Sequence, residues 1–174
     1  MKLELFHPFV NSAREVLSIE IHETAERGEL RLETGLHVTQ DVTVIISLVG
    51  MVNGTVFFSM SNDVAIKLAS ALINEKFDTF DRLAQSGIAE LGNVITGRAS
   101  MKFAEAGYET DISTPSLVIG KGTAISTLDF PRLVVPLTTS IGSITIHLAL
   151  REEVQTSLKA IQSQASKTFE ISKG

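Results

Sequence analysis

The sequence predicts an α+β domain in which helices pack on an antiparallel sheet built from two related hairpins. Segments of alternating apolar and polar residues occur in two pairs, and turn residues separate the members of each pair, as in antiparallel hairpins. Each pair follows helical periodicity, so the order helix, strand, strand occurs twice. The 174 residues suffice for one domain with a sizeable core, since 44% of them are hydrophobic.

The N-terminal part begins with a helix predicted over residues His7 to Ser18. Pro8 suits its opening turn, because proline lacks the N–H group that a first turn leaves unpaired. Further on, Leu30 and Leu32 alternate with charged neighbours, which indicates a short strand. The apolar face of the helix comprises Phe9, Ala13, Val16 and Leu17.

The first hairpin is predicted between Asp41 and Met60. Asn53-Gly54 is a strong hairpin signal, because asparagine and glycine favour the backbone of a tight turn. We therefore place the turn within the segment Val49 to Gly54. The alternating apolar residues on either side are Val42, Val44, Ile46, Val56, Phe58 and Met60.

Two helices are expected next. Ser61-Asn62-Asp63 offers capping oxygens for a helix over Val64 to Asn74. A longer helix is predicted from Thr79 to Ala106, and Gly107 suits the position after its C-terminus, where a left-handed backbone favours glycine.

The C-terminal half supplies the second hairpin. Extended chain is predicted over residues 108–119, followed by a turn at Gly120-Lys121-Gly122. Leu133 to Leu137 and Ser143 to Leu150 are predicted as paired strands, the latter as a central strand rather than an exposed edge. The domain is expected to cover residues 1–151, and residues 152–174 are expected to form a helical tail.

The two hairpins resemble each other in sequence, which suggests an internal duplication. Gly54 to Met60 aligns with Gly142 to Leu148, which lies 88 residues later. A chance match between two half-buried hairpins is the alternative interpretation.

Composition excludes several classes of function. The net charge is −5 and no Lys or Arg cluster stands out, which argues against nucleic-acid or anionic-membrane binding. The chain has no cysteine and no apolar run near the ~20 residues of a membrane span. We expect a cytoplasmic protein, since the segment Met1 to Phe6 does not resemble a signal peptide.

The most informative feature is a polar stripe on the long predicted helix. At about 100° per residue, its members fall within a sector roughly 60° wide, and the apolar residues Ile88 and Leu91 lie on the other side. The stripe comprises Ser86, Glu90, Asn93 and Gly97, and Arg82 lies one turn before it.

The residue types of the stripe suit contact with a partner. Gly97 costs about 1 kcal/mol relative to alanine inside a helix, and a bare position there lets a partner approach closely. Glu90 can bind a cationic group, and the Asn93 amide can hold a water molecule through a donor and an acceptor. Hydrolysis of a phosphoryl group needs such a positioned water. A solvated helix face is the alternative interpretation.

Other candidate sites carry weaker signals. The four histidines, His7, His22, His37 and His147, lack the spacing of metal ligands on one helix or strand, and no metal site is predicted. Gly120-Lys121-Gly122 lacks the pattern of a phosphate-binding loop.

The pattern Ser-x-x-x-Glu-x-x-Asn-x-x-x-Gly at residues 86–97, in the long helix of a domain with paired hairpins, resembles the CheC/CheX family. Three further segments resemble the CheX branch, and the likeness covers about residues 5–151. A single motif also favours that branch. The three further segments that resemble the CheX branch are Pro8 to Ala13, Gly50 to Gly54 and Ile146 to Arg151.

The resemblance implies a phosphatase that acts on the aspartyl phosphate of a CheY-like receiver domain. Glu90 would pair with a receiver lysine, and Asn93 would orient the attacking water. Ser86, Gly97 and Arg82 would belong to the contact surface. The receiver would hold Mg²⁺, this chain would bind no cofactor, and the protein would form a homodimer. The long tail and the irregular segment 120–131 depart from the family pattern.

Two other functions use the same features. A non-catalytic adaptor would hold a receiver or another signalling partner with the same helix face. A structural dimerisation domain would carry the stripe as ordinary surface.

Overall fold

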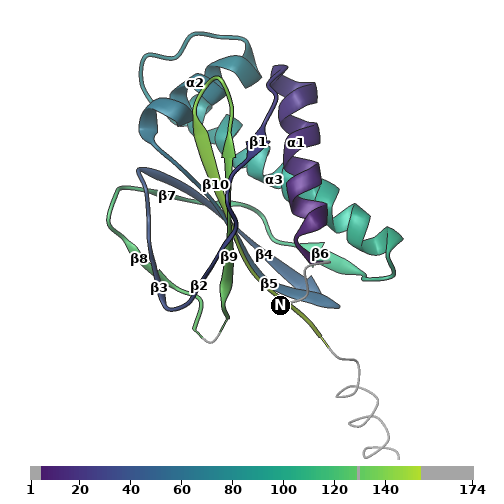
Figure 1. The fold of residues 1–174 in the computed structure, drawn as a ribbon. Helices are drawn as coiled ribbons and strands as arrows, with labels where there is room; N and C mark the ends of the chain where they lie inside the picture. The colour runs from purple at the N-terminus through teal and green to yellow at the C-terminus, as the bar shows by residue number, and fades with distance from the viewer. Residues whose placement is uncertain (1–4, 129, 154–174) are drawn as a thin grey trace, which may run out of the picture.

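The computed structural model describes residues 5–128 and 130–153, and Figure 1 shows the arrangement of the elements. Three helices lie against an eight-stranded antiparallel sheet, and a second sheet has two strands. The predicted α+β class is confirmed. The helices are α1 (His7–Ile21), α2 (Asn62–Ile73) and α3 (Arg82–Glu105). The main sheet contains β1 (Glu26–Arg27), β2 (Arg31–Glu33), β4 (Val42–Gly50), β5 (Val52–Met60), β6 (Thr110–Ile112), β7 (Ser116–Ile119), β9 (Arg132–Thr138) and β10 (Ser143–Glu152). The small sheet contains β3 (Leu36–Val38) and β8 (Ala124–Ser126).

The strand order places the two predicted hairpins side by side at the centre of the main sheet. The order is β1-β9-β10-β5-β4-β6, so β10 is a central strand, as predicted. Phe58 of β5 pairs with Ile146 of β10, and the two residues are 88 positions apart. This spacing equals the offset of the sequence repeat, so Phe58 pairs with its own repeat counterpart, and the pairs on either side of it are related to each other by exchange of the two strands. A local two-fold axis between the two strands follows from that register.

The outer strands join the two halves more closely. Strands β1 and β2, from the N-terminal half, both pair with β9 of the other half. Strands β6 and β7, from the C-terminal half, both pair with β4. Each half therefore completes the sheet of the other, which explains why the repeat forms one domain.

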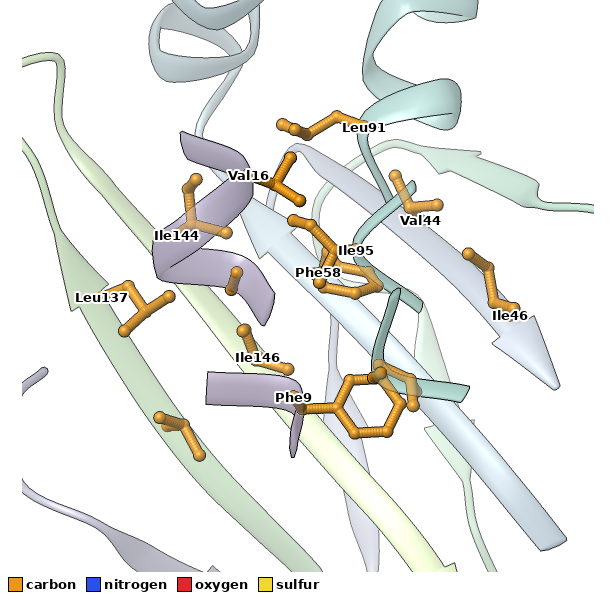
Figure 2. Packing of buried hydrophobic residues seen from close by; sticks show 14 of the residues in the cluster. Phe9, Val16, Val44, Ile46, Phe58, Leu91, Ile95, Leu137, Ile144 and Ile146 are labelled. Atoms are coloured by element: carbon orange, nitrogen blue, oxygen red, sulfur yellow. The ribbon is translucent and has the colours of Figure 1, made fainter. Parts of the chain in front are cut away.

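The core lies between the helices and one face of the main sheet. Side chains alternate between the faces of a strand, so Val44, Phe58 and Ile146 all face the helices and are at most 2% exposed. Figure 2 shows these residues packing with Phe9 of α1 and Ile95 of α3. The apolar faces predicted for both helices are thereby accounted for.

Gly92 explains how closely α3 approaches the sheet. A Cβ atom at this position would lie 2.9 Å from Cγ1 of Val44 and 3.3 Å from Cδ2 of Phe58. A methyl group would therefore force the helix away from the core. Gly92 therefore allows close packing of α3 against the sheet.

The turn of the first hairpin lies within the predicted segment Val49 to Gly54, but the prediction that Asn53-Gly54 supplies the turn residues is wrong. The register of β4 and β5 centres the turn on Met51, and both residues of the pair lie inside β5. Gly54 has φ 137°, and a Cβ there would lie 2.0 Å from the carbonyl oxygen of Ala149. The glycine serves the close approach of β10 rather than a turn, and sequence alone does not separate these two uses.

The ends of α3 follow from specific hydrogen bonds. The helix begins at Arg82, three residues later than predicted, because the Asp81 side chain accepts hydrogen bonds from the backbone N–H groups of Leu83 (3.0 Å) and Ala84 (2.9 Å). At its other end Gly107 has φ 87° and donates its N–H to the carbonyl of Ala104, as the sequence predicts for a C-terminal glycine.

The remaining boundaries differ from the prediction by small amounts. Helix α1 continues three residues beyond Ser18, and α2 begins after the predicted Ser61 cap. Strands β1, β3 and β8 lack a clear sequence signal because each has only two or three residues. Strand β10 runs through Glu152, one residue past the predicted domain boundary. The predicted helical tail beyond residue 153 lies outside the described residues.

Candidate functional site on helix α3

Helix α3 holds the predicted polar stripe on a rigid support. Its buried side packs on the sheet and on α1, and the residues there are at most 5% exposed. Ser86 and Glu90 are exposed on the other side, and Asn93 and Gly97 are half-buried. The structure therefore brings these four residues onto one accessible face. The buried residues are Ala84, Ile88, Leu91, Gly92, Ile95, Thr96, Ala99 and Phe103.

Asn93 and Glu90 interact directly. The Nδ2 atom of Asn93 donates a hydrogen bond to Oε2 of Glu90 across 3.5 Å. The bond is long and exposed, so it orients the amide at little cost and can break when a partner docks. The hydrogen bond uses one amide N–H of Asn93. The amide oxygen and the second N–H of Asn93 take no part in it.

Gly97 is not required by packing inside the domain. Among the described residues, and apart from the neighbouring backbone of α3 itself, a Cβ built there would meet Cδ1 of Ile112 at 3.8 Å, which is an ordinary van der Waals distance. Gly87 and Gly92, on the same helix, would bring a Cβ to 3.0 Å from Cδ1 of Ile73 and 2.9 Å from Cγ1 of Val44. The open space at Gly97 thus lies on the polar stripe itself, where contact with a partner is predicted from the sequence.

Arg82 is exposed in the first turn of α3. A positive side chain at a helix N-terminus opposes the helix dipole slightly, so local stability does not explain this residue. Sequence analysis missed two further residues on this face, Leu83 and Met101, which are 50% and 66% exposed. Helical spacing would have found them, because both lie within about 20° of Glu90 around the helix axis.

The comparisons with known proteins identify the family. The family model described as Chemotaxis phosphatase CheX matches residues 42–138, which include α3, the first hairpin and strand β9 of the second. The chain belongs to the CheX family. Its sequence is 30% identical over 109 residues to the CheY-P phosphatase CheX of Thermotoga maritima, a match that covers 62% of this chain and 68% of that protein. The predicted resemblance to the CheX branch is confirmed.

Solved structures extend the likeness to the fold. A CheX-CheY-BeF3-Mg²⁺ complex from Borrelia burgdorferi contains a chain 29% identical to this CheX-family protein, with a TM-score of 0.73. That match covers 87% of this chain and 100% of the other. A CheC-like superfamily protein from a Shewanella species is 25% identical, with a TM-score of 0.78 and coverage of 87% and 99%.

A second polar cluster of this CheX-family chain lies on the opposite face of the sheet from α3. His37 of β3 and His147 of β10 are both buried, and their ring centroids are 4.1 Å apart. His37 also stacks on Phe57, and its Nε2 atom lies 3.4 Å from Oγ of Ser59. The sequence prediction did not join these histidines, because they meet only when β3 folds over the sheet.

Burial governs the charge state of this histidine pair. Desolvation lowers the pKa of His147 to about 3, and the positive charges of His37 and Arg132 add to the effect. Desolvation also lowers the pKa of His37, with a further contribution from Arg132. Both rings are therefore neutral near pH 7.

Arg132, at the start of β9, contacts the chain on either side of the β2–β3 corner in the same region. Its side chain is 1% exposed, and its Nη1 atom donates a hydrogen bond of 2.6 Å to the carbonyl oxygen of Gly35. Its Nη2 atom lies 3.4 Å from Oε2 of Glu33. These contacts hold the corner between β2 and β3 against β9, so we assign the cluster a structural role.

Residues 5–128 and 130–153 contain no group of three or more His, Cys, Asp or Glu side chains arranged to hold a metal ion. Over the same residues, no helix has the length and apolar character to cross a bilayer.

Proposed function

We propose that this CheX-family chain hydrolyses the aspartyl phosphate of a CheY-like receiver domain in chemotaxis. The observation that carries the proposal is the exposed Asn93–Glu90 pair on α3, beside the open space at Gly97. Family membership supports the reaction class, since the Thermotoga maritima relative is a CheY-P phosphatase.

Each residue of the pair has a separate task in this proposal. Glu90 accepts a hydrogen bond from a receiver lysine and so fixes the orientation of the two proteins. Asn93 then enters the receiver site, where its amide orients one water molecule in line with the phosphoryl group. The water oxygen forms a bond to phosphorus as the bond to the aspartate oxygen breaks, which yields inorganic phosphate and a free carboxylate. Positioning of this kind is the main demand that phosphoryl transfer makes on a protein.

The surrounding residues shape the contact. Gly97 leaves room for the receiver backbone next to Asn93, and Ser86 offers a small polar side chain one turn before Glu90. Arg82 lies at the same end of α3 and can meet acidic groups of the receiver. The proposal assigns Mg²⁺ to the receiver, where it neutralises charge on the phosphoryl oxygens.

Phosphate release from a phosphorylated CheY-like receiver in the presence of Mg²⁺ tests the proposal. The native chain should accelerate release, and Asn93→Ala should abolish the acceleration while it retains most of the affinity. Glu90→Lys should instead weaken docking. The matched control is Glu20→Ala, which changes an exposed carboxylate on α1, outside the proposed contact.

The outcomes separate the proposal from its alternatives. Binding of a receiver without accelerated release would identify a non-catalytic adaptor that uses the same face. Equal behaviour of Glu90→Lys and the native chain would leave the stripe as ordinary surface of a structural domain.

We further propose that the protein works in the cytoplasm as a homodimer in a two-component pathway. The proposed location rests on the proposed CheY-like substrate, which would have to be in the same compartment. Exposed apolar side chains on neighbouring short strands support self-association: Leu32 is 65%, Leu36 65% and Val38 60% exposed. Light scattering of the purified chain measures its mass directly, and a monomer at all concentrations would contradict the dimer.

A further inference from the structure

Two exposed apolar residues lie in line with the polar stripe of α3. Leu83 and Met101 are separated by 18 residues, which is five helical turns, so both side chains leave the helix in the same direction. Glu90 lies within about 20° of that direction, between them along the axis. The pair therefore frames the Asn93–Glu90 site at both ends of one face.

Their exposure is not explained inside the domain. Leu83 is 50% and Met101 is 66% exposed, and they are the exposed large hydrophobic residues of α2 and α3 within the described part of the chain. Isolated exposed apolar residues are common on protein surfaces. Leu83 and Met101, however, both lie on the face of α3 that the proposed function assigns to the receiver. Their shared exposure on this face needs an explanation.

The polar stripe alone is too small to hold a protein partner. A specific interface usually buries about 800 Å² on each side, and a serine, a glycine and one carboxamide supply little of that area. In protein interfaces, the contacts that surround the energetically important residues exclude water from them, and methionine is enriched. Exclusion of water around Glu90 would also strengthen its attraction to a lysine.

We propose that the receiver-docking surface extends along the whole of α3, and that Leu83 and Met101 are its affinity-determining apolar contacts. The inference rests on the proposed function and concerns the same site. The two side chains are about 27 Å apart along the helix, close to the diameter of a small domain, so one receiver can cover both. The partner thus presents two apolar contacts that flank its phosphorylated aspartate and its lysine.

A binding measurement that does not depend on catalysis tests the surface. The probe is a CheY-like receiver loaded with beryllofluoride and Mg²⁺, and the dissociation constant is measured for Leu83→Ala, Met101→Ala and the double variant. Alanine keeps the helix, since its helix propensity is at least that of leucine and methionine. We expect the dissociation constant to rise about fivefold in each single variant and about 25-fold in the double variant.

The matched control is Ile19→Ala, because Ile19 is 56% exposed on α1 and lies outside the proposed surface. It should leave the dissociation constant unchanged. In phosphate-release assays the double variant should raise KM with kcat within twofold of the native value, unlike Asn93→Ala, which should lower kcat. Thermal unfolding of each variant verifies that α3 is intact, and Leu83→Gln with Met101→Gln replaces any variant that fails to fold.

Three results would overturn the inference: an unchanged dissociation constant in the double variant, an equal loss in Ile19→Ala, or a fall in kcat at constant KM. Failure of the proposed function gives a different pattern. A native chain that binds the loaded receiver without releasing phosphate refutes hydrolysis, and the binding comparison still decides the role of Leu83 and Met101. A native chain that binds no receiver refutes both.

Discussion

His37 of β3 and His147 of β10 face each other with ring centroids 4.1 Å apart, on the side of the sheet opposite α3. The contact joins the small β3–β8 sheet to the centre of the main sheet. Burial keeps both rings neutral near pH 7, and two imidazolium charges beside Arg132 would repel each other in this desolvated space.

Stability should therefore fall as the pH falls below about 6.5. The pKa of His147 is about 3 in the folded protein and near 6.5 in the unfolded chain, so unfolding takes up a proton between these values. The free energy of unfolding is fully retained above pH 6.5 and decreases toward pH 3, at up to about 1.4 kcal/mol per pH unit for one proton.

Urea titrations at pH 7, 6, 5 and 4 measure this dependence. His147→Gln removes one titrating ring and should flatten the profile relative to the native chain. Ile19→Ala, at an exposed position on α1 without a titratable side chain, is the control and should leave the slope unchanged. Identical slopes for the native chain and His147→Gln would contradict the assignment.

Gly97→Ala should separate stability from activity. Alanine is favoured over glycine inside a helix by about 1 kcal/mol, and the new methyl group meets only Ile112 at an ordinary distance. The free energy of unfolding should therefore rise by about 1 kcal/mol. Phosphate release should slow, because the methyl group would occupy the space beside Asn93 that the proposed function assigns to the receiver.

Gly92→Ala is the comparison for that variant. The same methyl group at residue 92 would approach Val44 to 2.9 Å, so this change should lower the free energy of unfolding by about 1–3 kcal/mol. Denaturant unfolding and phosphate release on both variants give the result. A Gly97→Ala protein with native activity would remove the glycine from the contact surface.

Asp81→Ala should destabilise the helix that carries the site. The Asp81 carboxylate accepts the hydrogen bonds of two backbone N–H groups at the start of α3, and loss of such a cap costs about 1 kcal/mol. Asp78→Ala is the control, because Asp78 contacts Lys76 with both side chains more than 80% exposed. Chemical unfolding should show a shift for the first variant and almost none for the second.

The geometry of the polar stripe was accessible from sequence because a helix has a fixed angular period. Ser86, Glu90 and Gly97 fall on one face in the structure as they do on a helical projection, and the buried face is correct as well. The catalytic roles of Glu90 and Asn93 stay predictions. The apolar ends of the same face, Leu83 and Met101, could also have been found in this way.

Features that depend on contacts between distant strands could not be predicted from the sequence. Asn53-Gly54 has the composition of a turn, yet Gly54 serves a close contact with Ala149, which lies 95 residues away in the chain. His37 and His147 meet only through the folding of a three-residue strand over the sheet. Local patterns carry no information on such long-range pairings.

The exchange of outer strands makes the two halves of this chain behave like the subunits of a tethered dimer. Neither half can form a finished sheet by itself, since the edge strands of each belong to the other. Helix α3 comes from the second half, yet it packs on α1 and α2 of the first as well as on β6 of its own. The face of α3 that carries Glu90 and Asn93 is therefore supported by both halves at once, so we expect a proteolytic fragment that contains one half alone to lose this support.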